Sequence, residues 1–300
     1  MGITHFSGPV FAEGGFVGAA GMGGPAGKVF YVNTNTSSAA RNQDRPWYQV
    51  DGSTVFSTLQ AAIDACVDDR GDVIYVARAY MAVTTSVLFN KAGISVIAQG
   101  YGMAPREQGE YFTIDCSSGP AATVSRSCRI QGLGFHTADT GTKSCAMLLE
   151  NDSSYQGWMH LNYCRFVNWG TATEYGINAE AGANNQIEHC VFEGTAGQPF
   201  TAGIAFGGSP TQNPIQNEVY DCRFRDCTYG IDHVDGTPQN FVYKENVFVD
   251  SKGLNSRAAA ADGLVCGNWF ETATNATTYD DTVGTLQGQG IQFSGNHYSE

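Results

Sequence analysis

The tripeptide Cys164-Arg165-Phe166 returns along the second half of this chain with small changes, and this repetition decides the fold. Variants with an aromatic third residue stand at Cys190–Phe192, Cys222–Phe224, Asn246–Phe248, Asn268–Phe270 and Asn296–Tyr298, with a degenerate precursor at Leu133–Phe135. The six steps from Phe135 to Tyr298 give a mean period of about 27 residues. A repeat of this length predicts a solenoid, in which stacked coils bury one continuous core.

Each repeat contains two further apolar signals. An aliphatic residue precedes most of the phrases, at Ile130, Leu161, Ile187, Val219 and Val242. A phrase of a small residue followed by an aliphatic one recurs at Ala146-Met147, Gly176-Ile177, Gly203-Ile204, Gly230-Ile231, Gly263-Leu264 and Gly290-Ile291. Several apolar phrases per period predict at least two inward-facing strands in every coil, with polar corners between them.

Composition excludes some classes of partner. The chain has 300 residues, 42% of them hydrophobic, and a net charge of −13. A negative protein with scattered basic residues lacks the electrostatic attraction that nucleic acids and anionic membranes require, so we predict neither as a partner. No apolar stretch is long enough to cross a bilayer. Three of the nine cysteines, Cys164, Cys190 and Cys222, share one slot of the repeat and are predicted to be buried free thiols.

The region before the repeats divides into an arm and an entry to the solenoid. Residues 1–27 are rich in glycine and predict an extended N-terminal arm. A strand is expected at Lys28–Asn33 and another at Asp72–Ala77, with a helix at about 57–68 between them, capped by Ser53 or Ser57. Residues 28–300 then form one β-helix domain, whose regular coils run from about 128 to 298.

A family resemblance rests on this entry. Ser57-Thr58-Leu59-Gln60-Ala61-Ala62-Ile63-Asp64, followed by Gly71–Ala77, resembles the beginning of proteins of the pectate-lyase-like superfamily. The resemblance implies an all-β, single-stranded, right-handed parallel β-helix in which the helix caps the N-terminal end. It is specific for the fold and not for function, because this superfamily holds lyases, hydrolases, phage tailspikes and inert structural proteins.

A second resemblance concerns the first residues. Ile3-Thr4-His5-Phe6-Ser7-Gly8-Pro9-Val10 is similar to the opening of tailed-phage virion proteins that accompany the major capsid protein. This similarity implies a non-enzymatic virion structural protein that decorates or cements the capsid exterior. The arm would bind the capsid protein or a neighbouring virion protein through its apolar residues, Ile3, Phe6, Pro9, Phe11 and Phe16. Analogy with phage β-helices predicts a homotrimer, and the missing signal peptide predicts synthesis in the host cytoplasm.

An alternative function is a tailspike-like glycan depolymerase, hydrolase or lyase, or a glycan-binding β-helix. Three positions before the coil phenylalanine stand Asp221 and Glu245, and two positions after it stand Asp226 and Asp250. Stacking by one coil places each pair about 4.8 Å apart, close to the roughly 5–5.5 Å between the carboxyl groups of a retaining glycosidase. However, coil corners are polar in any solenoid, which favours a structural interpretation. Trp169 and Tyr229 are the aromatic candidates for a sugar groove, although packing explains them equally well.

Other kinds of site are not predicted. The six histidines form no His-x-x-x-His pair, and no cofactor motif stands in a suitable context, so we expect neither a metal nor a cofactor. Asn246, Asn268 and Asn296 are predicted to form a corner ladder of amide hydrogen bonds, in left-handed turn positions that asparagine tolerates.

Overall fold

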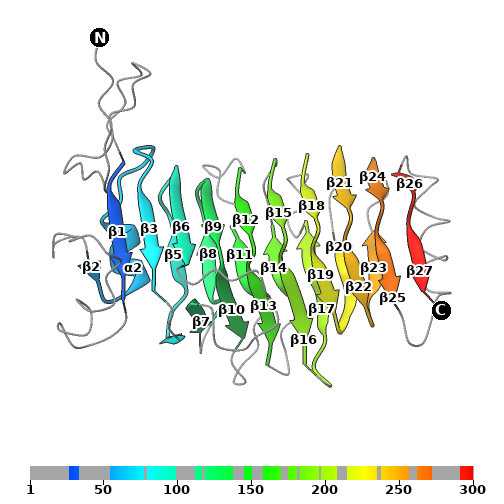
Figure 1. Ribbon diagram of the computed structural model, residues 1–300, viewed down its shortest axis with the longest axis horizontal. Helices are drawn as coiled ribbons and strands as arrows, with labels where there is room; N and C mark the ends of the chain where they lie inside the picture. The colour runs from blue at the N-terminus through cyan, green and yellow to red at the C-terminus, as the bar shows by residue number, and fades with distance from the viewer. Residues whose placement is uncertain are drawn as a thin grey trace, which may run out of the picture.

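Parallel strands wind around one axis in the computed structural model of the protein (Figure 1). The structure describes residues 27–33, 55–77, 80–98, 112–116, 119–137, 145–150, 158–169, 175–180, 183–195, 197–207, 215–234, 238–256, 262–271 and 291–299. The predicted arm therefore lies outside the described residues, except for Gly27. Within the described residues, no helix is long and apolar enough to cross a membrane.

The largest sheet, sheet A, has eleven strands. In spatial order these are β2 (Val55–Phe56), β1 (Val29–Val32), β3 (Val73–Val76), β6 (Ile94–Ala98), β9 (Cys128–Gln131), β12 (His160–Asn162), β15 (Gln186–Glu188), β18 (Glu218–Tyr220), β21 (Phe241–Lys244), β24 (Gly263–Cys266) and β26 (Ile291–Ser294).

Two further sheets complete each coil. Sheet B has nine strands: β4 (Tyr80–Val83), β7 (Phe112–Cys116), β10 (Leu133–Thr137), β13 (Arg165–Asn168), β16 (Val191–Gly194), β19 (Arg223–Arg225), β22 (Val247–Val249), β25 (Trp269–Glu271) and β27 (His297–Ser299). Sheet C has seven: β5 (Val87–Phe89), β8 (Ala122–Val124), β11 (Cys145–Leu149), β14 (Tyr175–Ala179), β17 (Phe200–Phe206), β20 (Cys227–His233) and β23 (Lys252–Ser256). The chain passes from sheet A to B to C and back to A, so we name the three turns of a coil the AB, BC and CA corners.

A ladder of phenylalanine rings runs through the core and explains the repeated phrase. Phe135, Phe166, Phe192, Phe224, Phe248 and Phe270 are buried, and consecutive rings stack with centroids 4.8 to 5.1 Å apart. Parallel strands in register bring identical side chains to about this spacing. One aromatic residue per period is therefore enough to build a continuous apolar column.

The glycines of sheet C give the phenylalanine rings room. A Cβ added to Gly203 would stand 2.5 Å from the ring of Phe224, and one added to Gly230 would stand 2.1 Å from that of Phe248. Such contacts are closer than van der Waals packing allows, so only glycine fits there. The next member of this column is Gly253, since Ile231 pairs with Leu254.

Two sequence alignments are wrong in this part of the solenoid. Gly263-Leu264 and Ile291 lie in sheet A instead of continuing the sheet C column, which the short coil between Phe224 and Phe248 already continues at Gly253. Similarly, Val219 pairs with the buried Tyr243, not with Val242, which occupies the outward-facing position. Alignment by residue type fails in this coil, because the inward position five residues before Phe248 holds an aromatic residue instead of an aliphatic one.

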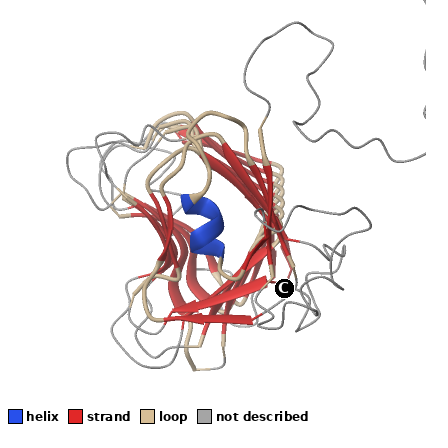
Figure 2. Ribbon diagram, turned by 90° about the vertical axis from the view of Figure 1, so that its left-hand side faces the viewer, coloured by secondary structure: helices blue, strands red, loops and turns tan. Residues whose placement is uncertain are grey.

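The N-terminal end is closed by a short helix. Figure 2 looks at this end and shows the helix α2 (Leu59–Asp64) lying across the space that the three sheets enclose. Its three buried residues, Leu59, Ala62 and Ile63, are apolar and follow helical spacing. The helix is shorter than predicted, and its N-cap is Thr58 instead of Ser53 or Ser57: the Thr58 hydroxyl accepts a hydrogen bond from the Ala61 N–H at 3.2 Å.

The corners share one backbone design, in which a left-handed residue precedes a buried or, at Asn296, half-buried one. At the AB corner the left-handed residues have φ from 47 to 75° and are Gly132, Tyr163, His189, Asp221, Glu245, Gly267 and Gly295. At the CA corner they include Trp158, Asn184, Gln216 and Asn240, and at the BC corner Asp226 and Asp250. The left-handed residue turns the chain, and its successor points into the core.

The predicted asparagine ladder is confirmed, but its stated reason is wrong. The Asn246 N–H donates to Asn268 Oδ1 at 2.9 Å, and the Asn268 N–H donates to Asn296 Oδ1 at 3.0 Å. The left-handed residues are their predecessors, Glu245, Gly267 and Gly295. Asparagine is used here because its amide satisfies buried backbone groups of the neighbouring coils, a role that a hydrocarbon side chain cannot fill.

Candidate functional site

The predicted carboxylate pairs lie on two different corners of the solenoid. Asp221 and Glu245 occupy the AB corner, where the Asp221 N–H donates to the Lys244 carbonyl at 3.1 Å. Asp226 and Asp250 occupy the BC corner, where the Asp226 N–H donates to the Val249 carbonyl at 3.2 Å. These backbone bonds confirm that each pair stacks by one coil. The predicted arm residues Ile3, Phe6, Pro9, Phe11 and Phe16 lie outside the described residues.

The AB pair is engaged by neighbouring side chains. Asp221 Oδ2 lies 2.9 Å from His189 Nδ1, and the His189 ring stacks on Tyr163 at 4.6 Å. Glu245 lies 3.3 Å from Lys244 Nζ, and a hydrogen bond from Tyr220 lowers the pKa of its carboxyl, which outweighs the small effect of burial. A carboxylate held in its ionised form is poorly suited to act as a general acid.

In the BC pair, the pKa of one carboxyl group is shifted upwards instead of downwards. Burial raises the pKa of Asp226, and the charge of Asp250 raises it further, while Arg225 opposes both. The Arg225 Nε atom lies 3.4 Å from Asp226 Oδ2, and its Nη1 atom lies 3.5 Å from Glu193. A raised pKa is the direction of shift that favours the role of general acid for a carboxyl group. Catalysis by either pair remains a prediction.

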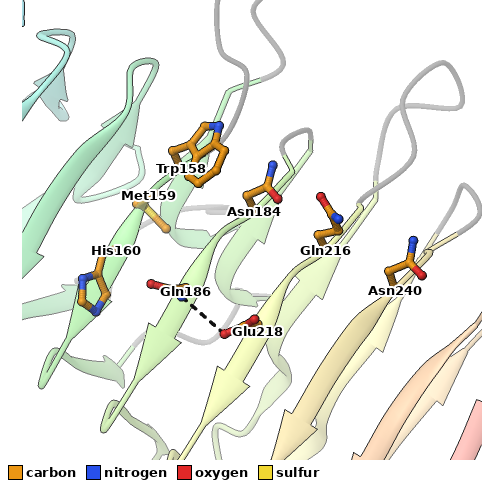
Figure 3. Close-up of a pocket in the computed structure, with 8 residues that line it drawn as sticks. All are labelled: Trp158, Met159, His160, Asn184, Gln186, Gln216, Glu218 and Asn240. Atoms are coloured by element: carbon orange, nitrogen blue, oxygen red, sulfur yellow. Dashed lines mark hydrogen bonds between the residues drawn. The ribbon is translucent and has the colours of Figure 1, made fainter.

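The CA corner holds a groove that sequence analysis missed. It has a volume of about 630 Å³ and lies on the outer side of sheet A (Figure 3). We call it the CA groove and define it by its lining residues: Trp158, Met159, His160, Asn184, Gln186, Gln216, Glu218 and Asn240. Four of them are the left-handed residues of successive coils, which Figure 3 shows at the same level of neighbouring strands.

A simple column in the sequence could have revealed this groove. Trp158, Asn184, Gln216 and Asn240 each stand eight positions before a coil phenylalanine. The positions three residues before and two residues after the coil phenylalanine attracted attention because they hold carboxylates. The position eight residues before it holds three carboxamides and one indole instead. Uncharged side chains carry no obvious catalytic signal, although they are strong hydrogen-bonding groups.

The groove combines one exposed aromatic ring with a row of polar groups. The side chain of Trp158 is 67% exposed. Gln186 Nε2 donates to Glu218 Oε2 at 3.4 Å, and His160 Nε2 lies 3.2 Å from Glu188 Oε2 beside the groove. An aromatic face together with fixed polar groups is the usual composition of a small-molecule site. The predicted aromatic candidates lie elsewhere: Trp169 packs against His136 with the two rings tilted, and Tyr229 lies under Lys252.

Three ionisable side chains lie on the outer side of sheet B. Asp115 and His136 are adjacent along one column, and Arg165 follows on the next strand. Each has one buried atom without a hydrogen-bond partner: Asp115 Oδ1, His136 Nδ1 and Arg165 Nε. Burial, helped by Arg165, lowers the pKa of His136 to about 4, so this ring is neutral at physiological pH. Such atoms fit a buried water molecule, which needs two to four polar partners.

The cysteines are packing residues. All nine are free, and all but Cys266 are buried, which confirms the prediction for Cys164, Cys190 and Cys222. Burial raises the pKa of Cys128 and Cys227 to about 12, so these thiols are protonated and weakly nucleophilic. Among the described residues, no three His, Cys, Asp or Glu side chains gather in a way that could hold a metal ion.

Comparison with known proteins agrees with this architecture. A family model described as the right-handed beta helix region matches residues 74–283. The chain belongs to this right-handed β-helix family. Its membership confirms the predicted fold class, including the handedness of the solenoid. No curated protein matches the chain.

Solved structures share the fold at low sequence identity. The structure of pectate lyase Pel9A is 15% identical, with a TM-score of 0.53, over 92% of this chain and 78% of that one. A pectin methylesterase from carrot is 10% identical, with a TM-score of 0.48, over 83% of this chain and 81% of that one. A pectin methylesterase from Aspergillus niger is 9% identical, with a TM-score of 0.49, over 90% and 85%. The fold is thus shared with a pectate lyase, and fold alone does not transfer its chemistry.

Proposed function

We propose that this protein is a non-enzymatic structural protein of a tailed-phage particle, where it decorates or cements the capsid. The observation that carries the proposal is the use of polar residues at the AB corner. Ring stacking of Tyr163 on His189, the contact of His189 with Asp221 and the asparagine ladder all join one coil to the next. The AB-corner side chains whose types could act in catalysis therefore make structural contacts between the coils of the solenoid.

The architecture suits an exposed and durable part of a particle. The strands of the three sheets pair within the chain, from coil to coil, along the whole described solenoid. A strand edge that is already paired offers no template to foreign chains, and a rod of stacked coils resists local opening. The acidic surface, with a net charge of −13, also favours solubility at high local concentration.

Attachment is proposed to occur through the N-terminal arm. Its apolar residues Ile3, Phe6, Pro9, Phe11 and Phe16 would fill pockets of the major capsid protein or of a neighbouring virion protein. The glycines between them allow the backbone to follow another surface closely. A homotrimer on the capsid exterior completes the proposal, and light scattering of the purified protein measures its mass directly.

Co-sedimentation with capsids stripped of accessory proteins tests the proposal. We expect the full-length protein to pellet with capsids and the variant Phe6→Ser/Phe11→Ser/Phe16→Ser to stay in the supernatant. Trp269→Ser, which changes an exposed aromatic residue of β25, is the matched control and should pellet normally. If the wild-type protein does not pellet, or if the arm variant pellets equally well, the proposed attachment is wrong.

One observation favours a second candidate, a glycan depolymerase at the BC corner. The raised pKa of Asp226 beside Asp250 is what a carboxyl pair that shares acid and base roles requires. An assay of new reducing ends over a panel of host polysaccharides tests it. Asp226→Asn should abolish cleavage, whereas Glu245→Gln, at the AB corner, should leave it unchanged. Absence of cleavage by the wild-type protein would eliminate this candidate.

A further inference from the structure

The CA groove has a feature that distinguishes it from the rest of the solenoid. Tryptophan and glutamine rarely adopt the left-handed conformation, yet Trp158 has φ of 69° and Gln216 has φ of 56°. At the AB corner, the left-handed Tyr163 and His189 stack on each other. Within the described residues, in contrast, no hydrogen bond or ring contact engages the side chains of Trp158, Asn184 or Gln216. Contacts between coils therefore do not explain why these residue types stand there.

The backbone behind the groove is held rigidly. Asn185 Nδ2 donates to Asn217 Oδ1 at 3.0 Å, and the Met159 N–H donates to Asn185 Oδ1 at 3.2 Å. Both asparagine side chains are buried. The left-handed residues immediately before them are thereby presented to solvent on a fixed frame. A frame that is ordered before binding lowers the entropic cost of binding a ligand.

The chemistry of the lining indicates the class of ligand. Carboxamides offer both donors and acceptors, as Asn184, Gln186, Gln216 and Asn240 do, and Trp158 offers an apolar face. The eight lining residues include no Lys or Arg, and the protein carries a net charge of −13. The lining therefore offers an anionic ligand no Lys or Arg counter-charge, and Arg129, the register partner of His160 on β9, lies outside it. A neutral ligand with many hydroxyl groups and apolar C–H faces would find partners for both.

We propose that the CA groove binds a neutral oligosaccharide whose chain runs along the solenoid axis. One sugar ring packs on the indole of Trp158, and the hydroxyl groups of the following rings bind the carboxamides of Asn184, Gln216 and Asn240. Glu218 accepts a further hydroxyl hydrogen bond. Parallel coils repeat these groups about every 4.8 Å, which suits a ligand that is itself a repeating chain. The volume of about 630 Å³ lies within the range of small-molecule sites.

The proposal does not depend on attachment to a capsid or on the BC carboxylates. The purified full-length protein is applied to an array of neutral and acidic oligosaccharides, and the strongest ligand is titrated by calorimetry. We expect binding to neutral glycans. The dissociation constant should change little between about 50 mM and 500 mM salt, a range over which exposed ion pairs become screened, because no ion pair contributes. Binding of acidic glycans alone, or of none, would overturn the proposal.

Variants locate the site. Trp158→Asn and Gln216→Gly remove the binding groups while keeping residues that tolerate the left-handed backbone. Each should weaken binding by about ten-fold or more, as loss of a central contact does. Trp269→Ala, which truncates an exposed tryptophan on sheet B, is the matched control and should bind as the wild type does. Unchanged affinity of Trp158→Asn, with an unchanged melting temperature, would show that the glycan binds elsewhere.

Discussion

The AB and CA corners have the same backbone design and different surfaces. Each places a left-handed residue before a buried one in successive coils. At the AB corner the outward side chains bind one another: Tyr163 stacks on His189, and His189 contacts Asp221. At the CA corner Trp158, Asn184 and Gln216 line a groove instead. A left-handed residue marks where the solenoid turns, and the contacts of its side chain show whether that corner supports the rod or lines a groove.

The largest expected effect comes from breaking the buried ladder of the AB corner. In Asn268→Leu, the Asn246 N–H and the Tyr243 carbonyl, 2.9 and 3.1 Å from the Asn268 amide, would lose their partners. An unsatisfied buried group costs about 1–3 kcal/mol, so we expect the free energy of unfolding to fall by about 3 kcal/mol or more. Chemical denaturation measures it. The control is Asn240→Gly at the CA groove, and a loss of equal size there would contradict the distinction.

Acid is expected to act through a histidine behind the CA corner. His233 is buried, packs on Phe241 at 4.9 Å and lies 2.8 Å from the Tyr243 hydroxyl. Burial lowers its pKa from 6.5 to about 3. The unfolded chain therefore binds this proton first, and stability should be lost as the pH falls from 6.5 towards 3, by up to about 1.4 kcal/mol per pH unit.

Chemical denaturation at about pH 7, 6, 5 and 4 should reveal this decrease in the free energy of unfolding with falling pH. His136, whose pKa is lowered to about 4, adds an effect of the same sign over the upper part of that range. His233→Gln should flatten the slope and leave the contribution of His136. A stability that is equal at pH 7 and pH 5, roughly the range in which histidines titrate, would show that these rings are not buried in the folded protein.

Glycine substitutions compare the strain of the two corners directly. Gln216→Gly at the CA corner relieves the left-handed strain and removes no contact between coils, so we expect stability to rise by about 0.5 kcal/mol after the entropic penalty of glycine. Tyr163→Gly at the AB corner relieves similar strain but loses the stack on His189, worth about 0.5–1.5 kcal/mol. It should be neutral or destabilising. Chemical denaturation decides, and a larger gain for Tyr163→Gly would reverse the comparison.

The smallest effect is expected at the BC corner. Asp226→Asn keeps a residue that tolerates the left-handed backbone, and it removes the repulsion from Asp250 together with the attraction to Arg225. Because the pKa of Asp226 is raised, its charge is unfavourable on balance, so stability at pH 7 should rise by a few tenths of a kcal/mol, roughly the size of exposed charge effects. The gain should shrink at high salt, and a clear loss would assign Asp226 a supporting role.

Much of the fold could be predicted from the sequence because the repeat can be recognised in it. The phenylalanine phrase, the cysteine slot and the asparagine ladder were predicted at the residues where the structure has them. The helix was expected in the right place, since Leu59, Ala62 and Ile63 follow its period. Alignment failed at Gly263, where a shorter coil shifts the repeat, and at Val242, where the inward position holds the aromatic Tyr243 instead of an aliphatic residue. The mean period of the repeat does not give the length of an individual coil.

The candidate site was harder to predict because it depends on what lies outside the core. Asp221 and Asp226 stand five residues apart and were equally attractive as carboxylates. Only the structure separates the AB corner, where His189 binds Asp221, from the BC corner, where burial raises the pKa of Asp226. The CA groove escaped notice because its carboxamides resemble ordinary polar corner residues in a sequence.

The solenoid, its capping helix and the core columns could be predicted from the residue pattern alone. These features depend on which residues recur at each period, and burial of apolar side chains enforces that pattern. Only the tertiary structure decided the number of sheets, the register of the shorter coils and the partners of each outward side chain. Those depend on how neighbouring coils stack, because residues about 27 positions apart meet across a spacing of about 4.8 Å.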